Sequence, residues 1–416
     1  MGIGNIIVGQ SGGPTSVINS SLAGVFKTAR DRGAGKIFGM VHGIQGFLEG
    51  NYIDMTQHVR DNIEIELLKR TPSAFLGSCR YKLPTVEQGE ETYGKIFDNL
   101  KKLDVQHFFY IGGNDSMDTI KKLSQYADYH NIPINFMGVP KTVDNDLAMT
   151  DHTPGYGSAA KYIATICKEL MCDTVAYGTE SVTIVEIMGR NAGWLTAASA
   201  LAADDDCAGP DMIFLPERAF DMDKFLKAVQ ERVKRSKTAF VCISEGIKDA
   251  EGKYVCEAAQ SVIFKDSFGH ASLGGAASFL GNMVSKELGI KSRSVELSTL
   301  QRCAAHFSSR TDVTEAFLAG GQAVRAAFSG ESGKMVMFER VSNDPYDIIT
   351  TTCDVRKIAN VEKKVPEEWI TKDGTHVTKD IINYMKPLIQ AELSPFIVDG
   401  LPRHLHLNKE LILSCK

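Results

Sequence analysis

Two carboxylates and a lysine lie close together near the middle of the chain, in a pattern that suits group-transfer chemistry. Asp144 and Asp146 are one residue apart, and Lys141 precedes them after a proline. One carboxylate could hold a metal ion while the other accepts a proton from a hydroxyl, and the lysine could neutralise an anionic substrate. The alternative is a polar loop whose Asp and Asn side chains form turns and cap the next helix.

The stretch before these residues indicates where they lie in a fold. Residues 134–139 are mostly apolar, with the length and composition of a buried strand. Open α/β sheets bind ligands at the carboxyl ends of their strands. The carboxylates are therefore expected at a ligand site.

Two glycine-rich turns follow other apolar strands. Residues 5–8 lead into the turn 9–16, and residues 107–111 lead into the turn 112–116, which contains Asp115. Backbone amides of such turns bind phosphate at the positive end of the following helix. The first turn has neither the dinucleotide-binding nor the P-loop spacing. A plain tight turn, and an ordinary N-cap role for Asp115, are the alternatives.

Further charged residues also come directly after small or apolar stretches. Arg80 follows a run of small residues, Arg190 follows a strand predicted at 181–187, and Glu245 follows one predicted at 239–243. An arginine on a loop can bind phosphate through two parallel hydrogen bonds. A solvated surface arginine is the alternative for Arg80.

The alternation of strands and helices along the chain predicts an α/β fold. Parallel sheets covered by helices on both faces give this alternation. A chain of 416 residues is long enough for two such domains. The stretch after about residue 343 is more polar and irregular, with one helix predicted at 380–392.

Composition excludes several classes of function. A net charge of −5 without a basic stripe argues against binding nucleic acid. Nine cysteines without C-x-x-C spacing suit reduced thiols in a cytoplasmic protein. Residues 1–4 have no basic leader pattern, and the longest apolar run, 195–203, is far below the roughly 18 residues of a membrane span. We therefore expect a cytoplasmic protein without a membrane partner.

Taken together, the motifs resemble the phosphofructokinase superfamily, and within it the pyrophosphate-dependent members. The resemblance covers roughly residues 5–338. The motifs that carry it are Ser11-Gly12-Gly13, Gly112-Gly113-Asn114-Asp115-Ser116, Pro140-Lys141-Thr142-Val143-Asp144-Asn145-Asp146, Met188-Gly189-Arg190, Ser244-Glu245-Gly246 and Leu300-Gln301-Arg302.

The resemblance implies two Rossmann-like parallel-sheet domains with an irregular C-terminal extension. The phosphoryl-donor domain would span 1–157, where pyrophosphate and magnesium bind. The sugar-phosphate domain would span 158–340, with the segment after about 300 crossing back to the first domain. The extension would span 341–416.

The activity implied is the reversible transfer of a phosphoryl group from pyrophosphate to the 1-hydroxyl of fructose 6-phosphate, with Mg²⁺, in glycolysis and gluconeogenesis. Two alternatives stand beside it. One is the same chemistry on a related sugar phosphate such as sedoheptulose 7-phosphate. The other is a non-catalytic, sugar-phosphate-binding regulatory member, which the retained Asp144, Lys141, Arg190 and Glu245 disfavour because a silent site does not need its base.

Residue roles follow from the same resemblance. Asp144 is the expected base, and the other expected catalytic residues are Lys141, Asp115 and Arg190. The expected donor-binding residues are Gly12, Gly13, Arg80, Asn114 and Ser116, and the expected metal ligands are Asn114 and Asp115. The expected acceptor-binding residues are Thr142, Val143, Asp146, Met188, Gly189, Glu245, Arg293, Thr299 and Arg302.

Donor choice rests on two of these positions. ATP-using relatives have glycine where Asp115 and Lys141 stand. A carboxylate at 115 would occupy the space of an α-phosphate, and the lysine would stabilise departing phosphate. Asn114 stands where an aspartate usually helps hold magnesium, so Asp115, Asp144 or Asp146 would carry more of that task.

The acceptor side departs from the family pattern at two positions. Thr299 stands where many relatives have histidine or tyrosine, and Ser181 where many have an arginine that reaches the neighbouring subunit's sugar phosphate. Arg293, by resemblance, reaches into the adjacent subunit, which predicts a homodimer or homotetramer with shared sites. A salt bridge within one subunit is the alternative for Arg293.

Overall fold

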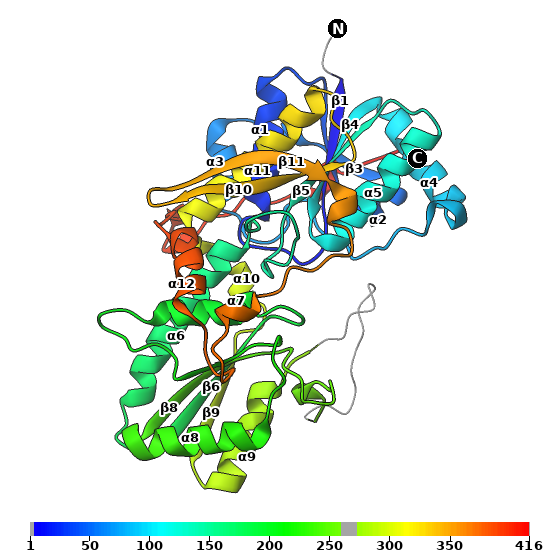
Figure 1. Ribbon diagram of the computed structural model, residues 1–416. Coiled ribbons are helices and arrows are strands. Elements are labelled where there is room, and N and C mark those ends of the chain that lie inside the picture. The colour runs from blue at the N-terminus through cyan, green and yellow to red at the C-terminus, as the bar shows by residue number, and fades with distance from the viewer. Residues whose placement is uncertain (1–3, 259–272, 416) are drawn as a thin grey trace.

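The structure is a computed structural model that describes residues 4–258 and 273–415 (Figure 1). The prediction that residues 1–4 show no leader pattern falls partly outside the described residues, because residues 1–3 are not among them. The described chain is organised around two sheets, which lie one above the other in Figure 1.

The first sheet has eight strands in the order β11-β10-β5-β4-β1-β2-β3-β14. Its central strands β10, β5, β4, β1 and β2 run parallel, and β11, β3 and β14 pair antiparallel at the edges. The strand bounds are β1 Asn5–Gln10, β2 Ile37–Met40, β3 Asn51–Asp54, β4 Val105–Gly112, β5 Asn135–Pro140, β10 Lys334–Asn343, β11 Tyr346–Asp354 and β14 Leu413–Ser414.

The second sheet has four strands, all parallel, in the order β7-β8-β6-β9. Their bounds are β6 Ser181–Ile187, β7 Met212–Phe214, β8 Thr238–Ser244 and β9 Lys291–Glu296. A separate hairpin pairs β12 Ile397–Val398 with β13 Leu401–Pro402. The predicted α/β class with two parallel-rich sheets is confirmed.

Helices cover both faces of each sheet, because successive side chains of a buried strand point to opposite faces. In β1, Ile6 and Val8 pack on the face that carries α1, α3 and α11, whereas Ile7 packs on the face that carries α2, α4 and α5. Two further clusters join α6, α7 and α12 to one face of the second sheet and α8 and α9 to the other. The helix bounds are α1 Ile18–Asp31, α2 Gly43–Leu48, α3 Asn62–Lys69, α4 Glu90–Lys102, α5 Asn114–Tyr129, α6 Tyr156–Val175, α7 Trp194–Ala197, α8 Met222–Ser236, α9 Ala276–Leu288, α10 Leu300–Cys303, α11 Arg310–Phe328 and α12 Lys379–Met385.

After β9 the chain returns to the first sheet through α11, which packs closely on α1. A Cβ on Gly24 would lie 2.1 Å from the carbonyl oxygen of Phe317, and one on Gly320 would lie 2.1 Å from that of Ser21. Only glycine permits this approach of two helix backbones. β10 then pairs with β5. The domain boundaries at 157 and 340 remain predictions.

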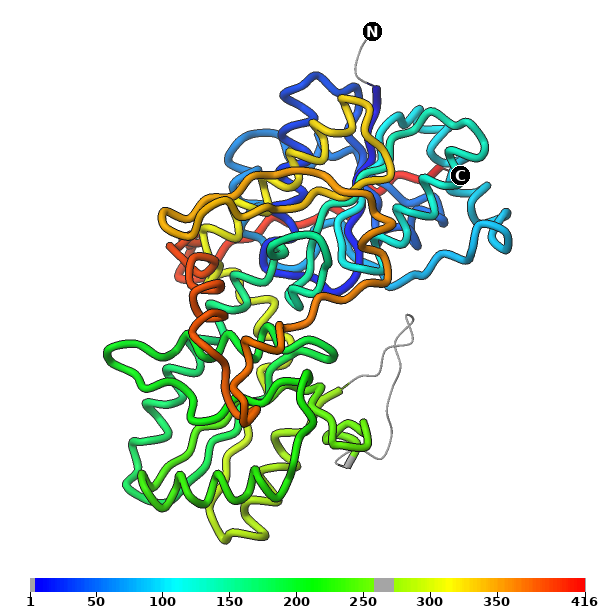
Figure 2. Tube along the Cα trace, in the orientation of Figure 1, coloured from blue at the N-terminus to red at the C-terminus, as the bar shows by residue number. Residues whose placement is uncertain are grey.

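The C-terminal extension contacts both sheets. β11 and β14 add strands to the first sheet, and Figure 2 shows the red C-terminal end of the trace in the same half of the molecule as its blue N-terminal part. The helix predicted at 380–392 is shorter: α12 ends at Met385 and a 3₁₀ turn, Lys386–Ile389, follows. Pro387 explains this end, because proline has no backbone N–H and cannot continue the α-helical hydrogen-bond pattern. No helix of the described residues is long and apolar enough to cross a bilayer.

Candidate active site

The carboxyl ends of strands from both sheets open into one cavity of ≈ 520 Å³. The loops after β1, β4 and β5 form its first-sheet side, and the loops after β6 and β8 form the opposite side. The alternation of strand and helix places these loops at one edge of each parallel sheet. The cavity therefore lies where two rows of strand ends meet.

Most of the residues singled out in the sequence line this cavity. They are Gly12, Gly13, Arg80, Asn114, Asp115, Ser116, Lys141, Thr142, Val143, Asp144, Asp146, Met188, Arg190, Glu245 and Arg302. Three do not line it. Thr299 is exposed, and Arg293 is half-exposed and pairs with Asp173 of the same chain. Gly189 lies behind the wall, where its N–H donates to Glu245 Oε1 at 3.5 Å.

Lys141, which is buried, and Asp144, which is half-buried, lie at the centre of the cavity wall. The Lys141 side chain is 2% exposed, and its Nζ donates to the carbonyl oxygen of Gly13 at 2.8 Å. Burial lowers the pKa of Lys141 to about 8, although the charge of Asp144 opposes this shift. Burial also raises the pKa of Asp144, against the opposing effect of Lys141. Lys141 is thus a stronger acid, and Asp144 a stronger base, than the same groups in water.

The negative charge of Asp144 acts on two further carboxylates. Burial, together with the charge of Asp144, raises the pKa of Asp146 to about 7 and that of Glu245 to about 7. Thr142 Oγ1 donates to Asp144 Oδ2 at 3.3 Å and accepts from the Asp144 N–H at 3.1 Å, which fixes that carboxylate. The wall can therefore exchange protons near neutral pH.

The opposite character, positive charge, comes from arginines. A Cβ on Gly13 would lie 2.8 Å from Arg302 Nη1, so glycine at this position lets the guanidinium approach the backbone. Burial, and the neighbouring charge of Arg80, lower the pKa of Arg302. Arg190 Nε is buried and has no hydrogen-bond partner among the described residues. A bound anion would satisfy this nitrogen and relieve the repulsion between the arginines.

The cavity can also take a hard cation together with an anionic ligand. Within residues 4–258 and 273–415, no group of three or more His, Cys, Asp or Glu side chains is arranged to hold a metal ion. Mg²⁺ needs fewer protein ligands, because it keeps waters and binds through one or two carboxylates plus substrate phosphates. Asp115, at the start of α5, faces the cavity and fits that pattern, which leaves Asp144 free to accept a proton.

Asn114, the other expected metal ligand, is engaged elsewhere. Its Oδ1 accepts from the N–H of Asn360 at 2.6 Å, and its Nδ2 donates to the carbonyl oxygen of Val361 at 2.9 Å. Both ends of the amide thus hold the C-terminal extension.

The sequence did not indicate that the extension reaches the cavity. Asn360 and Glu362 line it, and Glu362 Oε1 accepts from Asn191 Nδ2 at 2.9 Å. Their stretch, Glu362-Lys363-Lys364, has the composition of a solvated surface turn, so no local signal distinguishes it. The other lining residues that had been given no role lie within predicted turns or directly after predicted motifs: Pro14, Gly113, Asn191 and Ala192.

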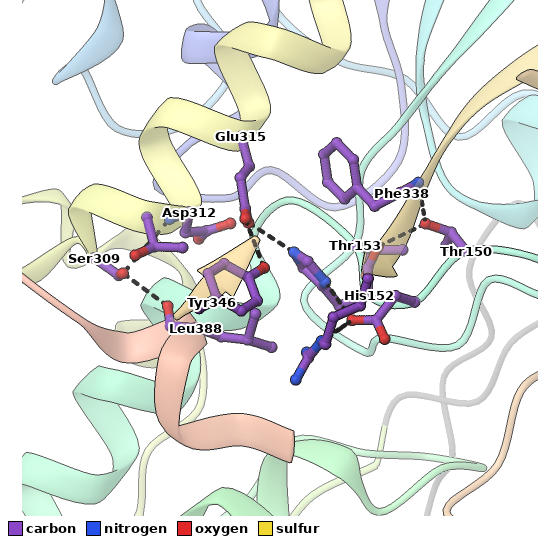
Figure 3. Close-up of polar contacts among 12 residues, drawn as sticks. Thr150, His152, Thr153, Ser309, Asp312, Glu315, Phe338, Tyr346 and Leu388 are labelled. Atoms are coloured by element: carbon purple, nitrogen blue, oxygen red, sulfur yellow. Dashed lines mark hydrogen bonds and ion pairs between the residues drawn. The ribbon is translucent and has the colours of Figure 1, made fainter. Parts of the chain in front are cut away.

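We call the loop after β5, which carries Asp144 and Asp146, the carboxylate loop. A buried ionic cluster lies behind it (Figure 3). His152 Nδ1 lies 2.8 Å from Asp151 Oδ1, and its Nε2 lies 2.7 Å from Glu315 Oε2. Tyr346 donates to Glu315 Oε1 at 2.7 Å. Burial opposes a charge on His152, but Glu315 and Asp151 outweigh it and raise the pKa of His152 to about 9. At neutral pH the histidine is therefore a cation between two carboxylates.

This cluster is connected to the carboxylate loop through Tyr384. The Tyr384 hydroxyl donates to the carbonyl oxygen of Asp151 at 2.6 Å and accepts from Asn145 Nδ2 at 2.9 Å. Asn145 has φ of +54°, a left-handed conformation that asparagine tolerates better than most residues. The bond from Tyr384 helps to hold that conformation, and with it the two carboxylates on either side.

Two parallel sheets whose strand ends enclose buried cations and carboxylates define an α/β protein built to bind phosphorylated ligands. Comparison with known proteins narrows this class. The sequence matches the family described as Phosphofructokinase over residues 5–327. The chain belongs to the phosphofructokinase family.

Its relatives match nearly the whole chain. A pyrophosphate–fructose 6-phosphate 1-phosphotransferase of Xanthomonas campestris pv. campestris is 44% identical over 408 residues, 97% of this chain and 96% of the relative. A protein of the same name from Methylococcus capsulatus is 40% identical with the same coverage. The crystal structure of a pyrophosphate-dependent phosphofructokinase from Nitrosospira multiformis has a TM-score of 0.89 at 38% identity, covering 99% of this chain and 98% of that one.

Proposed function

We propose that this chain is a phosphotransferase that moves a phosphoryl group from pyrophosphate to the 1-hydroxyl of fructose 6-phosphate, giving fructose 1,6-bisphosphate and phosphate. The reaction is reversible and serves glycolysis and gluconeogenesis in the cytoplasm. Full-length relatives that carry this activity in their names support the proposal. The observation that carries it is the pair of buried Lys141 and half-buried Asp144 in a cavity rich in arginine.

In this reaction Asp144 is the base. It accepts the proton of the 1-hydroxyl while the oxygen forms a bond to one phosphorus of pyrophosphate. The bond between that phosphorus and the bridging oxygen breaks, and the second phosphate leaves. Burial raises the pKa of Asp144, which makes its carboxylate a stronger base than a solvated aspartate.

Cations stabilise the charge that moves during this step. Lys141 lies at the donor side and neutralises the departing phosphate, while Arg80 and Arg190 bind the phosphoryl group in transit. Mg²⁺, held by Asp115 together with substrate phosphates, would neutralise phosphate oxygens when bound and leave Asp144 free as the base. Asn114 is not assigned to the metal, because its amide is already bonded to the C-terminal extension.

Asp115 also selects the donor. Its carboxylate lines the donor side of the cavity, where the α-phosphate of ATP would bring a further negative charge. Pyrophosphate ends before that position. Specificity for pyrophosphate therefore comes from a repulsive group as well as from an attractive one.

The acceptor side binds the sugar phosphate through the loop after β5 and through the loops of the second sheet. Its residues within one chain that line the cavity are Thr142, Val143, Asp146, Met188, Glu245 and Arg302. Gly189 supports Glu245 from behind, and Thr299, also expected on this side, lies outside the cavity. Arg293 completes the site of an adjacent subunit, so the active form is a homodimer or homotetramer.

A coupled assay at saturating Mg²⁺ tests the proposal. Pyrophosphate and ATP are each offered with fructose 6-phosphate and with sedoheptulose 7-phosphate. We expect turnover with pyrophosphate and fructose 6-phosphate, and none with ATP. Faster turnover of the seven-carbon sugar would correct the acceptor, and equal use of ATP would overturn the donor argument. Absence of turnover with every pair would favour a regulatory member.

A further inference from the structure

A segment of the C-terminal extension crosses from the first sheet to the second beside the candidate active site. We call residues 360–365 the strap. It follows β11 and the 3₁₀ turn Val355–Lys357, and in Figure 1 it belongs to the orange chain that descends from the first sheet toward α7. Two of its residues, Asn360 and Glu362, line the cavity. The strap is therefore part of the site wall.

On the donor side, the strap is held by Asn114, the first residue of α5. One amide side chain accepts from the Asn360 N–H and donates to the Val361 carbonyl oxygen. An aspartate of the same size could accept the first bond but could not donate the second. This gives a structural reason for asparagine at a position beside the donor.

The strap is attached to the carboxylate loop through its own residue Lys363. Its N–H donates to the carbonyl oxygen of Asp146 at 2.7 Å. Its Nζ donates to the carbonyl oxygens of Thr150 and Asp151 at 3.1 and 2.7 Å. One residue thus bonds both ends of the segment that runs from Asp146 to the buried ionic cluster.

On the second sheet, the strap is held by residues that follow β6 and β7. Trp194 Nε1 donates to the carbonyl oxygen of Lys363 at 2.9 Å, and Lys363 Nζ lies 5.2 Å from the centre of a Trp194 ring. Asn191, next to Arg190, donates to Glu362. The Val365 N–H donates to Glu217 Oε1 at 3.0 Å. The loop that carries Arg190 is therefore tied to the loop that carries Asp146.

We propose that the strap sets the relative position of the donor and acceptor halves of the active site, with Asn114 and Lys363 as positioning residues. Neither is a reacting group. Since phosphoryl transfer depends on alignment of donor, base and acceptor, loss of an anchor lowers turnover more than substrate binding. The kinetic part of this inference rests on the proposed function.

The first test compares Lys363→Met with Lys364→Met. Methionine keeps most of the length of lysine but donates no hydrogen bond, and Lys364 is the exposed neighbour in the same strap. For Lys363→Met we expect kcat to fall by about tenfold or more, with KM for both substrates within about threefold of the parent. For Lys364→Met we expect no change in either constant.

Tryptophan fluorescence gives a readout that does not require activity. The chain has two tryptophans, and a Trp369→Phe background leaves Trp194 as the only tryptophan, whose emission is read with excitation that tyrosine does not absorb. We expect Lys363→Met to shift the Trp194 emission in the absence of substrates, and Lys364→Met to leave it unchanged. Parent-like kcat and emission in Lys363→Met, or equal losses in both variants, would overturn the role of Lys363.

The second test is Asn114→Asp, for which two roles predict opposite results. An aspartate in the first turn suits the helix N-terminus, so the variant should fold. If Asn114 anchors the strap, kcat falls and trypsin cleaves more rapidly after Lys357 and Lys363. If position 114 serves the metal, a carboxylate lowers the Mg²⁺ concentration needed for half-maximal activity and kcat is kept. The latter result would overturn the anchor.

These readouts separate the inference from the proposed function. If the parent protein has no pyrophosphate-dependent activity, the proposed function fails, while emission and proteolysis still decide whether the strap is seated by these residues. If Lys363→Met does not fold, Asn114→Asp decides the question alone.

Discussion

At Asp144, burial and charge act on the pKa in opposite directions. Burial raises the pKa, and Lys141 and Arg190 lower it. The carboxylate can therefore accept a proton from a hydroxyl more readily than a solvated aspartate, while cations remain close enough to bind the phosphoryl group. Burial and the charge of Asp144 also raise the pKa of Asp146, to about 7, so Asp146 is the alternative candidate for the base.

Asp144→Asn should abolish turnover with little change in sugar-phosphate binding. The amide keeps the shape of the side chain but cannot take the proton, a loss of about two to four orders of magnitude in rate. Steady-state kinetics measures the first effect and titration calorimetry the second. Activity within a few-fold of the parent would move the base to another residue, and Asp146→Asn would then be the next variant.

At the scale of elements, the buried cluster of His152, Asp151 and Glu315 stabilises the junction of α11, β10 and the carboxylate loop. The pKa of His152 is raised in the folded state, so its contribution to stability is complete below its unfolded value of about 6.5 and is lost as pH rises through about 9. The size of this contribution is on the order of 3 kcal/mol.

His152→Gln should remove this pH dependence. The free energy of unfolding of the parent should exceed that of the variant most at about pH 6, and the difference should shrink toward about pH 9. Urea unfolding of both proteins at these values measures it. A difference that is the same at both pH values would mean that His152 is not charged in the fold.

A matched pair of glycines tests the packing of α11 on α1. Gly24→Ala would place a methyl group against the backbone of Phe317, at a cost of about 1–3 kcal/mol. Gly94→Ala, in α4, meets nothing within 4 Å and should stabilise the protein by roughly 0.5–1 kcal/mol. Unfolding midpoints of the two variants should therefore move in opposite directions. Equal shifts would contradict the close contact of the two helices.

The elements that carry motifs could be predicted from the sequence, and those of the extension could not. The loops with Asp115, Lys141 and Asp144 follow apolar strands, so local pattern alone places them at strand ends. Lys363 has no such pattern, because its partners are backbone carbonyls far away in the sequence. Contacts of that kind depend on the completed tertiary structure, which composition and spacing do not encode locally.

At the scale of the whole molecule, the two sheets and the strap enclose the cavity, and Arg293 is one of the three predicted residues that do not line it. Arg293 pairs with Asp173 on the surface, with side chains 47% and 53% exposed. An exposed pair of this kind contributes little stability and is readily exchanged for another anion. The pair is therefore compatible with a role for Arg293 in the site of a neighbouring subunit.

Arg293→Ala should raise KM for the sugar phosphate if active sites are shared between subunits, because a cation is lost from the acceptor side. Sedimentation at assay concentrations should show at least a dimer for the parent. Asp173→Ala is the matched control, since it removes the partner within the chain and leaves Arg293 in place. A fully active monomer would contradict shared sites.

The most direct measurement of the central claim follows the two phosphorus atoms of pyrophosphate. Uniformly ³²P-labelled pyrophosphate is incubated with fructose 6-phosphate and Mg²⁺, and the products are separated. We predict that label appears in equal amounts in fructose 1,6-bisphosphate and in free phosphate. Release of all label as free phosphate, or formation of labelled bisphosphate only from γ-labelled ATP, would contradict the claim that this protein transfers phosphoryl groups from pyrophosphate to the sugar.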